Sequence, residues 1–253
     1  MPPTVTPSKA GISRSTFSDV GSSKLFAAGT ADAVVRGAVD KVRVIVTTSH
    51  RPAQRTRSFV KDLASVIPGA IKLNRGKMTL RDLYYEAAGL GARRVVVVNS
   101  SKGNPSLVDV YEPLDPPEMR LSMIVRMALH GVRLSREVQG SQRIFRVSSI
   151  GVMVSGNASE PLYFVADTLA EAFMARVVPS FGRAQQLPTV VARVSQCDRP
   201  NCVAFIEFVC TRSGRVCGPA LWVRSVVNYV QGVRLYKDRW SAAARLEKRT
   251  GLA

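Results

Sequence analysis

The clearest hydrophobic pattern in the chain lies between Val42 and Lys77. The β-branched run at residues 42–46 predicts a strand that is buried on both faces, and polar residues follow it. A helix is predicted from about Pro52 to Val66, because proline fits a first helical turn and Pro68-Gly69 stops the helix. On a helical wheel its apolar residues share one side, and the opposite side carries four cations: Arg51, Arg55, Arg57 and Lys61.

The pattern continues to residue 111 and predicts a β-α-β-α-β order followed by one further strand. Residues 70–73 form a short predicted strand, and a turn follows at 74–77. Thr79-Leu80-Arg81-Asp82 is a capping box, with Asp in place of Glu, that opens a second helix ending at Gly89 and Gly91. Its buried face is expected at Leu80, Leu83, Tyr84, Ala87 and Ala88. The remaining strands are predicted at 95–98 and 107–111, on either side of a turn-rich loop.

Residues 113–118 contain three prolines, which exclude a helix or a central strand, so we predict a linker there. It separates a first half, 41–112, from a second half, 119–253. Residues 1–40 are rich in Ser, Thr, Ala and Gly and are predicted to be a flexible leader.

In the second half, strands are predicted at 119–129, 143–154, 189–196, 203–210 and 221–230, with a helix at 123–127 as an alternative. The capping box Thr168-Leu169-Ala170-Glu171 predicts the start of a helix that ends before Pro179. Asp238 is expected to cap a final helix that runs to about Arg249.

The charge of the chain narrows the class of its partner. Among 253 residues, 36 are Lys or Arg and 18 are Asp or Glu, which gives a net charge of +18, while 46% are hydrophobic. This composition is typical of a globular protein. Its positive electrostatic field favours binding to a polyanion, above all nucleic acid. No window reaches the roughly 18 apolar residues that cross a bilayer, and the start does not resemble a secretory signal. We therefore expect a cytoplasmic protein with no membrane partner.

The cations of the first half form the predicted site. Basic side chains beside the exposed N–H groups of a helix start suit phosphate, whereas a merely solvated helix face normally carries mixed charges. Further cations follow at the next turn and at the end of the second buried strand. The predicted RNA-binding set is Arg51, Arg55, Arg57, Lys61, Arg75, Lys77 and Lys102.

Four cysteines, Cys197, Cys202, Cys210 and Cys217, lie near the ends of two predicted hairpins. Their spacing is wider than the Cys-x-x-Cys steps typical of zinc sites. Reduced side chains and hairpin disulfides both stay open as alternatives.

Catalytic and cofactor sites have little support in the sequence. Gly76-Lys77-Met78 lacks the other residues of a P-loop, and Gly89 and Gly91 precede a strand, the reverse of a dinucleotide-binding turn. Neither histidine has a metal-ligand spacing, and the carboxylates are scattered. We therefore predict no catalytic residues, no metal and no cofactor. The alternative enzyme is an RNA-processing activity that uses Ser49 and His50 as an acid–base pair.

Several motifs together resemble the Brix-domain family of ribosome-biogenesis proteins, and most closely its single-domain archaeal members. They are Thr47-Thr48-Ser49 with Arg51-Pro52, Phe59-x-Lys61-Asp62-Leu63, Asn74-Arg75-Gly76-Lys77 and Lys102-Gly103-Asn104-Pro105. The resemblance implies an α/β fold of two similar halves, each a mixed sheet with helices, like the anticodon-binding domain of class IIa aminoacyl-tRNA synthetases.

The same resemblance implies a non-catalytic assembly factor that binds ribosomal RNA or its precursor and leaves other ribosome-assembly proteins open as partners. It weakens in the second half. There, Ala220 follows Gly218-Pro219 where the family commonly has Arg, and residues 203–208 lack the usual Arg- and His-rich strand. A basic protein-interaction scaffold on pre-ribosomal particles is a further alternative.

Overall fold

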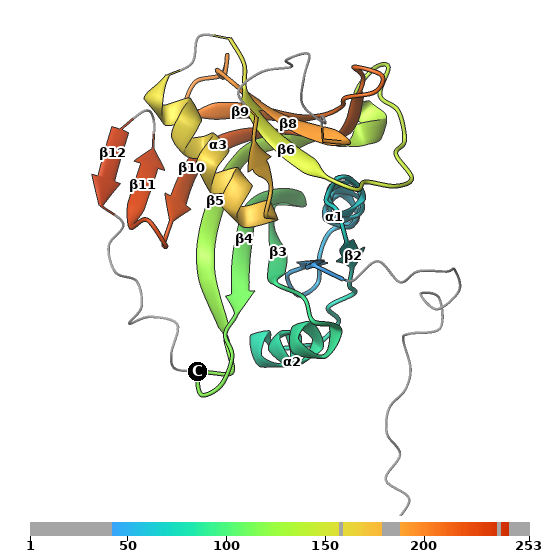
Figure 1. Ribbon diagram of the computed structural model, residues 1–253, viewed down its shortest axis with the longest axis vertical. Helices are drawn as coiled ribbons and strands as arrows, with labels where there is room; N and C mark the ends of the chain where they lie inside the picture. Colours follow the sequence, from blue (N-terminus) through green and yellow to red (C-terminus); the bar gives the residue numbers. More distant parts are fainter. Residues whose placement is uncertain (1–41, 157–158, 179–187, 237–238, 243–253) are drawn as a thin grey trace, which may run out of the picture. The chain divides into compact units, whose positions relative to one another are not determined.

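The computed structural model describes residues 42–156, 159–178, 188–236 and 239–242. The predicted leader at residues 1–40 lies outside this part. The described residues form a mixed α/β fold built on one sheet of twelve strands, as the sequence predicts in outline (Figure 1).

The first set of elements follows the predicted β-α-β-α-β order and adds a longer pair of antiparallel strands. It consists of β1 (Val44–Thr48), α1 (Gln54–Val66), β2 (Ala70–Lys72), α2 (Leu80–Leu90), β3 (Arg94–Ser101), β4 (Asn104–Pro113) and β5 (Leu121–Arg133). Strands β4 and β5 are longer than the strands predicted at 107–111 and 119–129, which they confirm. Strand β1 pairs in parallel with β2 and β3, while β3–β4 and β4–β5 are antiparallel. The capping box at Thr79 and Asp82 is confirmed, and Gly91 ends α2 in the left-handed region.

The second set repeats this pairing. Its elements are the 3-10 turn η1 (Ser135–Glu137), β6 (Ile150–Val154), α3 (Glu160–Phe173), β7 (Arg176–Val177), β8 (Val190–Ser195), β9 (Ala204–Cys210), β10 (Val216–Asn228), β11 (Val233–Tyr236) and β12 (Arg239–Ala242). Strand β6 pairs in parallel with β7 and β8, and β8–β9 and β9–β10 are antiparallel.

The two sets join through an antiparallel ladder between β5 and β10. The strand order is β2-β1-β3-β4-β5-β10-β9-β8-β6-β7, so the pairing pattern is the same when it is followed inward from either edge. The segment predicted as a linker, 113–118, lies in the connection between β4 and β5, where Pro113 pairs with Leu121. In the sheet this segment therefore joins two neighbouring strands of the first set.

The strands of the first set bury alternate residues on opposite faces of the sheet. Val44, Val46 and Val96 belong to the main core, which also contains the apolar faces of α1 and α3. Ile45 and Val95 point the other way and pack with Leu83 and Ala87 of α2. Helices α1 and α2 therefore cover opposite faces. Two residues predicted for the buried face of α2, Leu80 and Ala88, are exposed.

Helix α1 also reaches the second set, where Gly218 of β10 allows a close approach. A Cβ atom at Gly218 would lie 2.8 Å from both the Phe208 Cβ and the Val66 Cγ1. We expect Gly218→Ala to lower the free energy of unfolding by about 1–3 kcal/mol, because a strand or the helix must shift to make room.

Chemical denaturation measures this effect, and Gly89→Ala in α2 is the matched control. Apart from its chain neighbours and the backbone of its own helix, no atom lies within 4 Å of a Cβ at Gly89. Alanine should therefore raise stability there by up to about 1 kcal/mol through helix propensity. Equal effects at the two positions would contradict the packing argument.

Several element boundaries differ from prediction. Helix α1 begins at Gln54, two positions after Pro52, since Arg51 has a φ of 49° and Ala53 is the extended N-cap. Helix α3 begins at Glu160, so the capping box predicted at Thr168 is wrong. Residues 143–149 precede strand β6, and β5 is a strand throughout, including 123–127. Residues 239–242 form β12 where the final helix was expected, and Asp238 lies outside the described residues.

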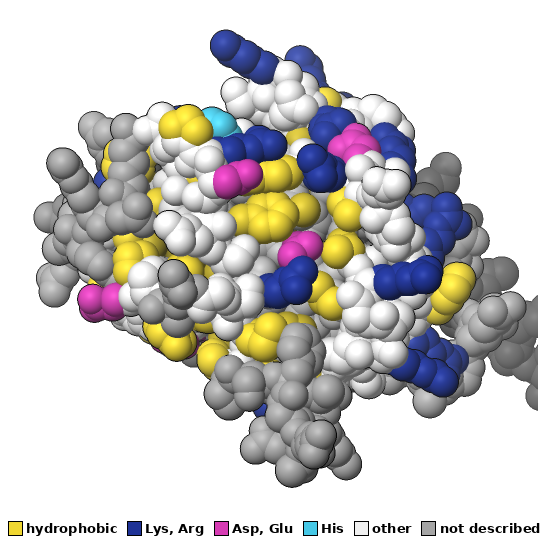
Figure 2. All heavy atoms as spheres, turned by 90° about the horizontal axis from the view of Figure 1, so that it is seen from above, with side chains coloured by type: hydrophobic (Ala, Val, Ile, Leu, Met, Phe, Trp, Pro, Cys, Tyr) yellow, Lys and Arg dark blue, Asp and Glu magenta, His cyan; other side chains and the backbone are white. Residues whose placement is uncertain are grey.

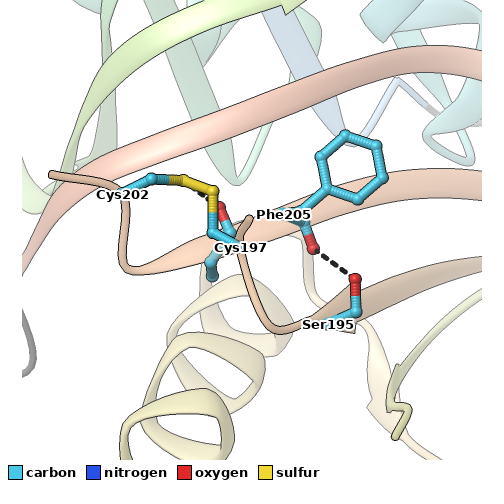
Figure 3. Close-up of a disulfide and its surroundings, with 5 residues drawn as sticks. Ser195, Cys197, Cys202 and Phe205 are labelled. Atoms are coloured by element: carbon cyan, nitrogen blue, oxygen red, sulfur yellow. Dashed lines mark hydrogen bonds between the residues drawn. A yellow bond between two sulfur atoms is a disulfide. The ribbon is translucent and has the colours of Figure 1, made fainter. Parts of the chain in front are cut away.

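The cysteines take two different states. Cys197 and Cys202 form a disulfide across the connection between β8 and β9 (Figure 3). The hairpin-disulfide alternative is therefore confirmed for this pair. Cys210 and Cys217 are free and buried, so the hairpin-disulfide alternative is wrong for this second pair. Burial and a hydrogen bond with Cys210 raise the pKa of Cys217, which keeps this thiol protonated and unreactive at neutral pH.

Candidate nucleic-acid interface

Three predicted cations lie at the end of the sheet where the carboxyl ends of β1 and β3 meet. These strands are parallel neighbours, so their ends meet at one edge. The Nδ1 atom of His50 lies 3.2 Å from the carbonyl oxygen of Gly76, which joins the loop after β1 to the turn after β2. Arg51 and Lys77 are exposed on these two segments, and Lys102 is exposed in the β3–β4 turn. We call these three residues the edge cations.

Arg75 does not project from its turn as predicted. Its side chain is buried, and its Nε atom donates a hydrogen bond of 2.9 Å to the carbonyl oxygen of Met78. Burial lowers the pKa of this guanidinium. Arg75 therefore stabilises the turn that presents Lys77.

Arg55 is held by an acidic side chain that is distant in the sequence. Its Nη1 and Nη2 atoms donate to the two carboxylate oxygens of Glu137 at 2.6 and 2.7 Å, and Nη2 also donates to the carbonyl oxygen of Val132 at 3.2 Å. This bidentate pair neutralises the Arg55 charge. Arg55 thus joins α1 to η1, and the expectation that it is a free phosphate contact is not supported by its geometry.

The Arg55–Glu137 pair makes a pH-dependent contribution to stability. Burial alone would raise the pKa of Glu137, but hydrogen bonds from Arg55 and from the Leu134 N–H outweigh it and hold the pKa below its ordinary value. A depressed carboxyl pKa stabilises the fold above the unfolded-state pKa, and this contribution disappears as the pH falls through the folded-state pKa.

We therefore expect Glu137→Gln to lower the free energy of unfolding at neutral pH by at most about 1 kcal/mol, since the pair is partly exposed. The difference from the unmodified protein should vanish in acid. Urea denaturation across pH measures it, with the exposed Glu118→Gln as control. A difference that stays constant with pH would contradict the assigned pair.

A groove lies between α1 and the segment from Leu134 to Phe145, and we call it the α1 groove. Its volume is about 940 Å³. Gln54, Arg57 and Lys61 recur at helical spacing along its α1 wall, and the opposite wall includes Arg136 and Arg143.

The α1 groove is strongly basic. Its five cations are Arg57, Lys61, Lys72, Arg136 and Arg143, and all are exposed. Within the described residues, no hydrogen bond or ion pair engages any of these five side chains. The single acid in the lining, Asp62, accepts a hydrogen bond of 2.8 Å from the Ser135 N–H. Unpaired guanidinium and ammonium groups of this kind are suited to phosphate.

Sequence reasoning found two of the five groove cations, Arg57 and Lys61, and missed the other three. Arg136 lies between two predicted strands, 119–129 and 143–154, whereas Arg143 and Lys72 lie within predicted strands. Phe145, also missed, lines the groove and is 93% exposed. No signal in the sequence marks it, because its exposure depends on β6 starting only at Ile150.

The surface more widely is basic, as the net charge implies. Figure 2 shows one face on which Lys and Arg side chains surround hydrophobic ones, with few acidic side chains between them. On the sheet, Arg199 stacks on Trp222 at 3.8 Å from the ring centre, and Arg193 pairs with Glu207. Some of the basic residues therefore have structural partners.

The geometry gives the alternative catalytic pair little support, because His50 Nδ1 faces the backbone of Gly76. In the described ranges, no group of three His, Cys, Asp or Glu side chains is placed to hold a metal ion. None of the helices described there is both long and apolar enough to cross a bilayer.

The known proteins that resemble this chain in sequence share one description. No family model matches the chain. It is 40% identical over 134 residues to a probable Brix domain-containing ribosomal biogenesis protein of Aeropyrum pernix, an alignment that covers 53% of this chain and 73% of that protein. The protein of the same description from Methanopyrus kandleri is 38% identical over 141 residues, 54% of this chain and 69% of its own length. For the Thermococcus kodakarensis protein these values are 43% over 95 residues, 38% and 44%.

Solved structures agree with the sequence relatives. The crystal structure of a probable ribosomal biogenesis protein from Aeropyrum pernix matches with a TM-score of 0.60 and 33% identity, over 72% of this chain and 94% of that one. Mil, an archaeal Imp4-like protein, matches with a TM-score of 0.50 over 73% of this chain and 99% of its own, and at 23% identity it supports the fold alone.

Proposed function

Because this chain belongs to the Brix-domain family of ribosomal biogenesis proteins, we propose that it assists ribosome assembly by binding ribosomal RNA or its precursor, chiefly through phosphate. The proposed role is binding without catalysis, in the cytoplasm, with other assembly proteins as further partners. The role in ribosomal biogenesis is inferred from the descriptions of the relatives. The contact with RNA is inferred from the charge of this chain.

The α1 groove is the observation that carries the proposal. It gathers five unpaired cations against one acid, on a protein with a net charge of +18. Two of these cations lie on α1, one lies on β2 and two lie on the segment opposite α1. Their charges therefore act on the same ligand. Phosphate groups of an RNA strand are the ligand class that neutralises such a set.

The edge cations Arg51, Lys77 and Lys102 are proposed as a second group of phosphate contacts. Arg51 follows β1, Lys77 follows β2 and Lys102 follows β3. These parallel strands end on the same side, where α1 also starts. The repeated strand pairing of the two sets supports two similar halves within residues 41–253, but it groups β5 with the first half, so it does not support a boundary at 113–118. It is compatible with the proposed likeness of each half to the anticodon-binding domain of class IIa aminoacyl-tRNA synthetases.

A salt titration of binding to ribosomal RNA fragments tests the proposal. If about six phosphates are engaged, the logarithm of the binding constant should fall with the logarithm of salt concentration at a slope of about four. A slope near one, or no binding at low salt, would reject it in favour of a protein-interaction scaffold. RNA cleavage that is lost in His50→Ala would instead favour the enzyme.

A further inference from the structure

Phe145 is the most exposed of the large hydrophobic residues in the described part of the chain. Its exposure is 93%, against 62% for Val230 and 51% for Tyr163. Leaving a phenylalanine in water forfeits the free energy of burying it. The apolar residues that flank it, Ile144 and Val147, pack against the main core, while the adjacent Arg146 is exposed. The segment is therefore docked by the residues on either side of Phe145, while the ring itself faces solvent.

The segment that carries Phe145 is anchored at its start by hydrogen bonds of Gln142. The Gln142 N–H donates to the carbonyl oxygen of Val216 at 2.9 Å, and its Nε2 donates to the Ser213 Oγ at 2.6 Å. The next residue, Arg143, is one of the five groove cations. An aromatic ring close in sequence to the anchored Gln142 thus lies in the wall of a groove whose charges attract phosphate.

We propose that the α1 groove binds an unpaired stretch of RNA, with one base stacked on Phe145 and the neighbouring phosphates held by Arg57, Lys61 and Arg143. This inference rests on the proposed function and adds the class of RNA. Every base has a face that can stack on an aromatic ring, whereas the bases of a duplex are already stacked on one another. The site therefore selects loops, bulges or single-stranded ends without reading a particular sequence.

The test measures binding of the full chain to a short single-stranded RNA that carries a fluorescent adenine analogue, and to a blunt duplex of the same sequence. We expect Phe145→Ala to weaken single-strand binding roughly ten-fold or more, within the range for one stacked base. The salt slope and the affinity for the duplex should not change, because no phosphate contact is removed.

Two further variants separate stacking from simple apolar contact. Phe145→Trp should retain both the affinity and the change in fluorescence of the base analogue, while Phe145→Leu should lose them as Phe145→Ala does. Retained affinity in Phe145→Leu or in Phe145→Ala, or a preference for the duplex, would overturn the inference. With a steep salt slope, such a result would leave the proposed function standing. An absence of any RNA binding by the unmodified protein would overturn both.

Discussion

We expect the triple substitution Arg57→Gln, Lys61→Gln and Arg143→Gln to lower the affinity for ribosomal RNA roughly 100-fold at about 0.1 M salt. Each lost charge-assisted contact costs at least about 1 kcal/mol, and every 1.4 kcal/mol is about a ten-fold change in the binding constant. Three lost phosphate contacts should also reduce the salt slope by about two. Fluorescence anisotropy at several salt concentrations measures both quantities.

A charge-matched variant shows whether the effect belongs to the groove. Arg81, Arg93 and Arg120 are exposed, and Arg81 lies on α2, which covers the opposite face of the sheet from α1. Replacing these three by glutamine removes the same net charge. Its affinity should stay within a few-fold of the unmodified protein, because distant surface charges are screened beyond about 10 Å. Equal losses in the two triple variants would mean that only the overall charge matters.

Phe59→Ala should lower the free energy of unfolding by about 3–5 kcal/mol. The Phe59 ring has no exposed surface, and α1, on which it lies, packs against strands of both sets, including β1 and β10. Truncation therefore leaves a cavity at the place where the two sets share a core. Denaturant unfolding followed by circular dichroism measures the loss.

Phe145→Ala is the matched control for this prediction, because it is the same substitution at a ring that is 93% exposed. Its effect on stability should stay within about 0.5 kcal/mol, as for surface positions in general. Phe59→Ala should in addition weaken RNA binding, since α1 is one wall of the groove. A small loss of stability in Phe59→Ala would show that α1 contributes less to the core than its burial implies.

Local signals predicted most of the first set of elements correctly. The capping box at Thr79 acts between residues three apart, so it works without knowledge of the rest of the chain. The same signal failed at Thr168. Thr168 is buried in the middle of α3, and its hydroxyl accepts a hydrogen bond of 3.4 Å from Asn228, whose Nδ2 also donates to Glu171 at 2.8 Å. Thr168 and Glu171 thus satisfy the buried side-chain amide of Asn228 on strand β10, which a local pattern cannot reveal.

The candidate site was predictable only where one element carries it. The cation face of α1 follows from helical periodicity, so Arg57 and Lys61 were found. The neutralisation of Arg55 was not predictable, because Glu137 lies 82 positions away in the sequence. Likewise, Arg136, Arg143 and Phe145 meet α1 only through tertiary folding.

The ladder between β5 and β10 runs from Ala220–Arg133 to Asn228–Val125, with local irregularities near Trp222 and Val223. A hinge motion between β5 and β10 would break several hydrogen bonds of this ladder at once, and each contributes about 1 kcal/mol. The two sets of strands therefore move as one unit. An RNA that contacts both sets must fit the fixed distance between them, so the RNA, and not the protein, has to deform.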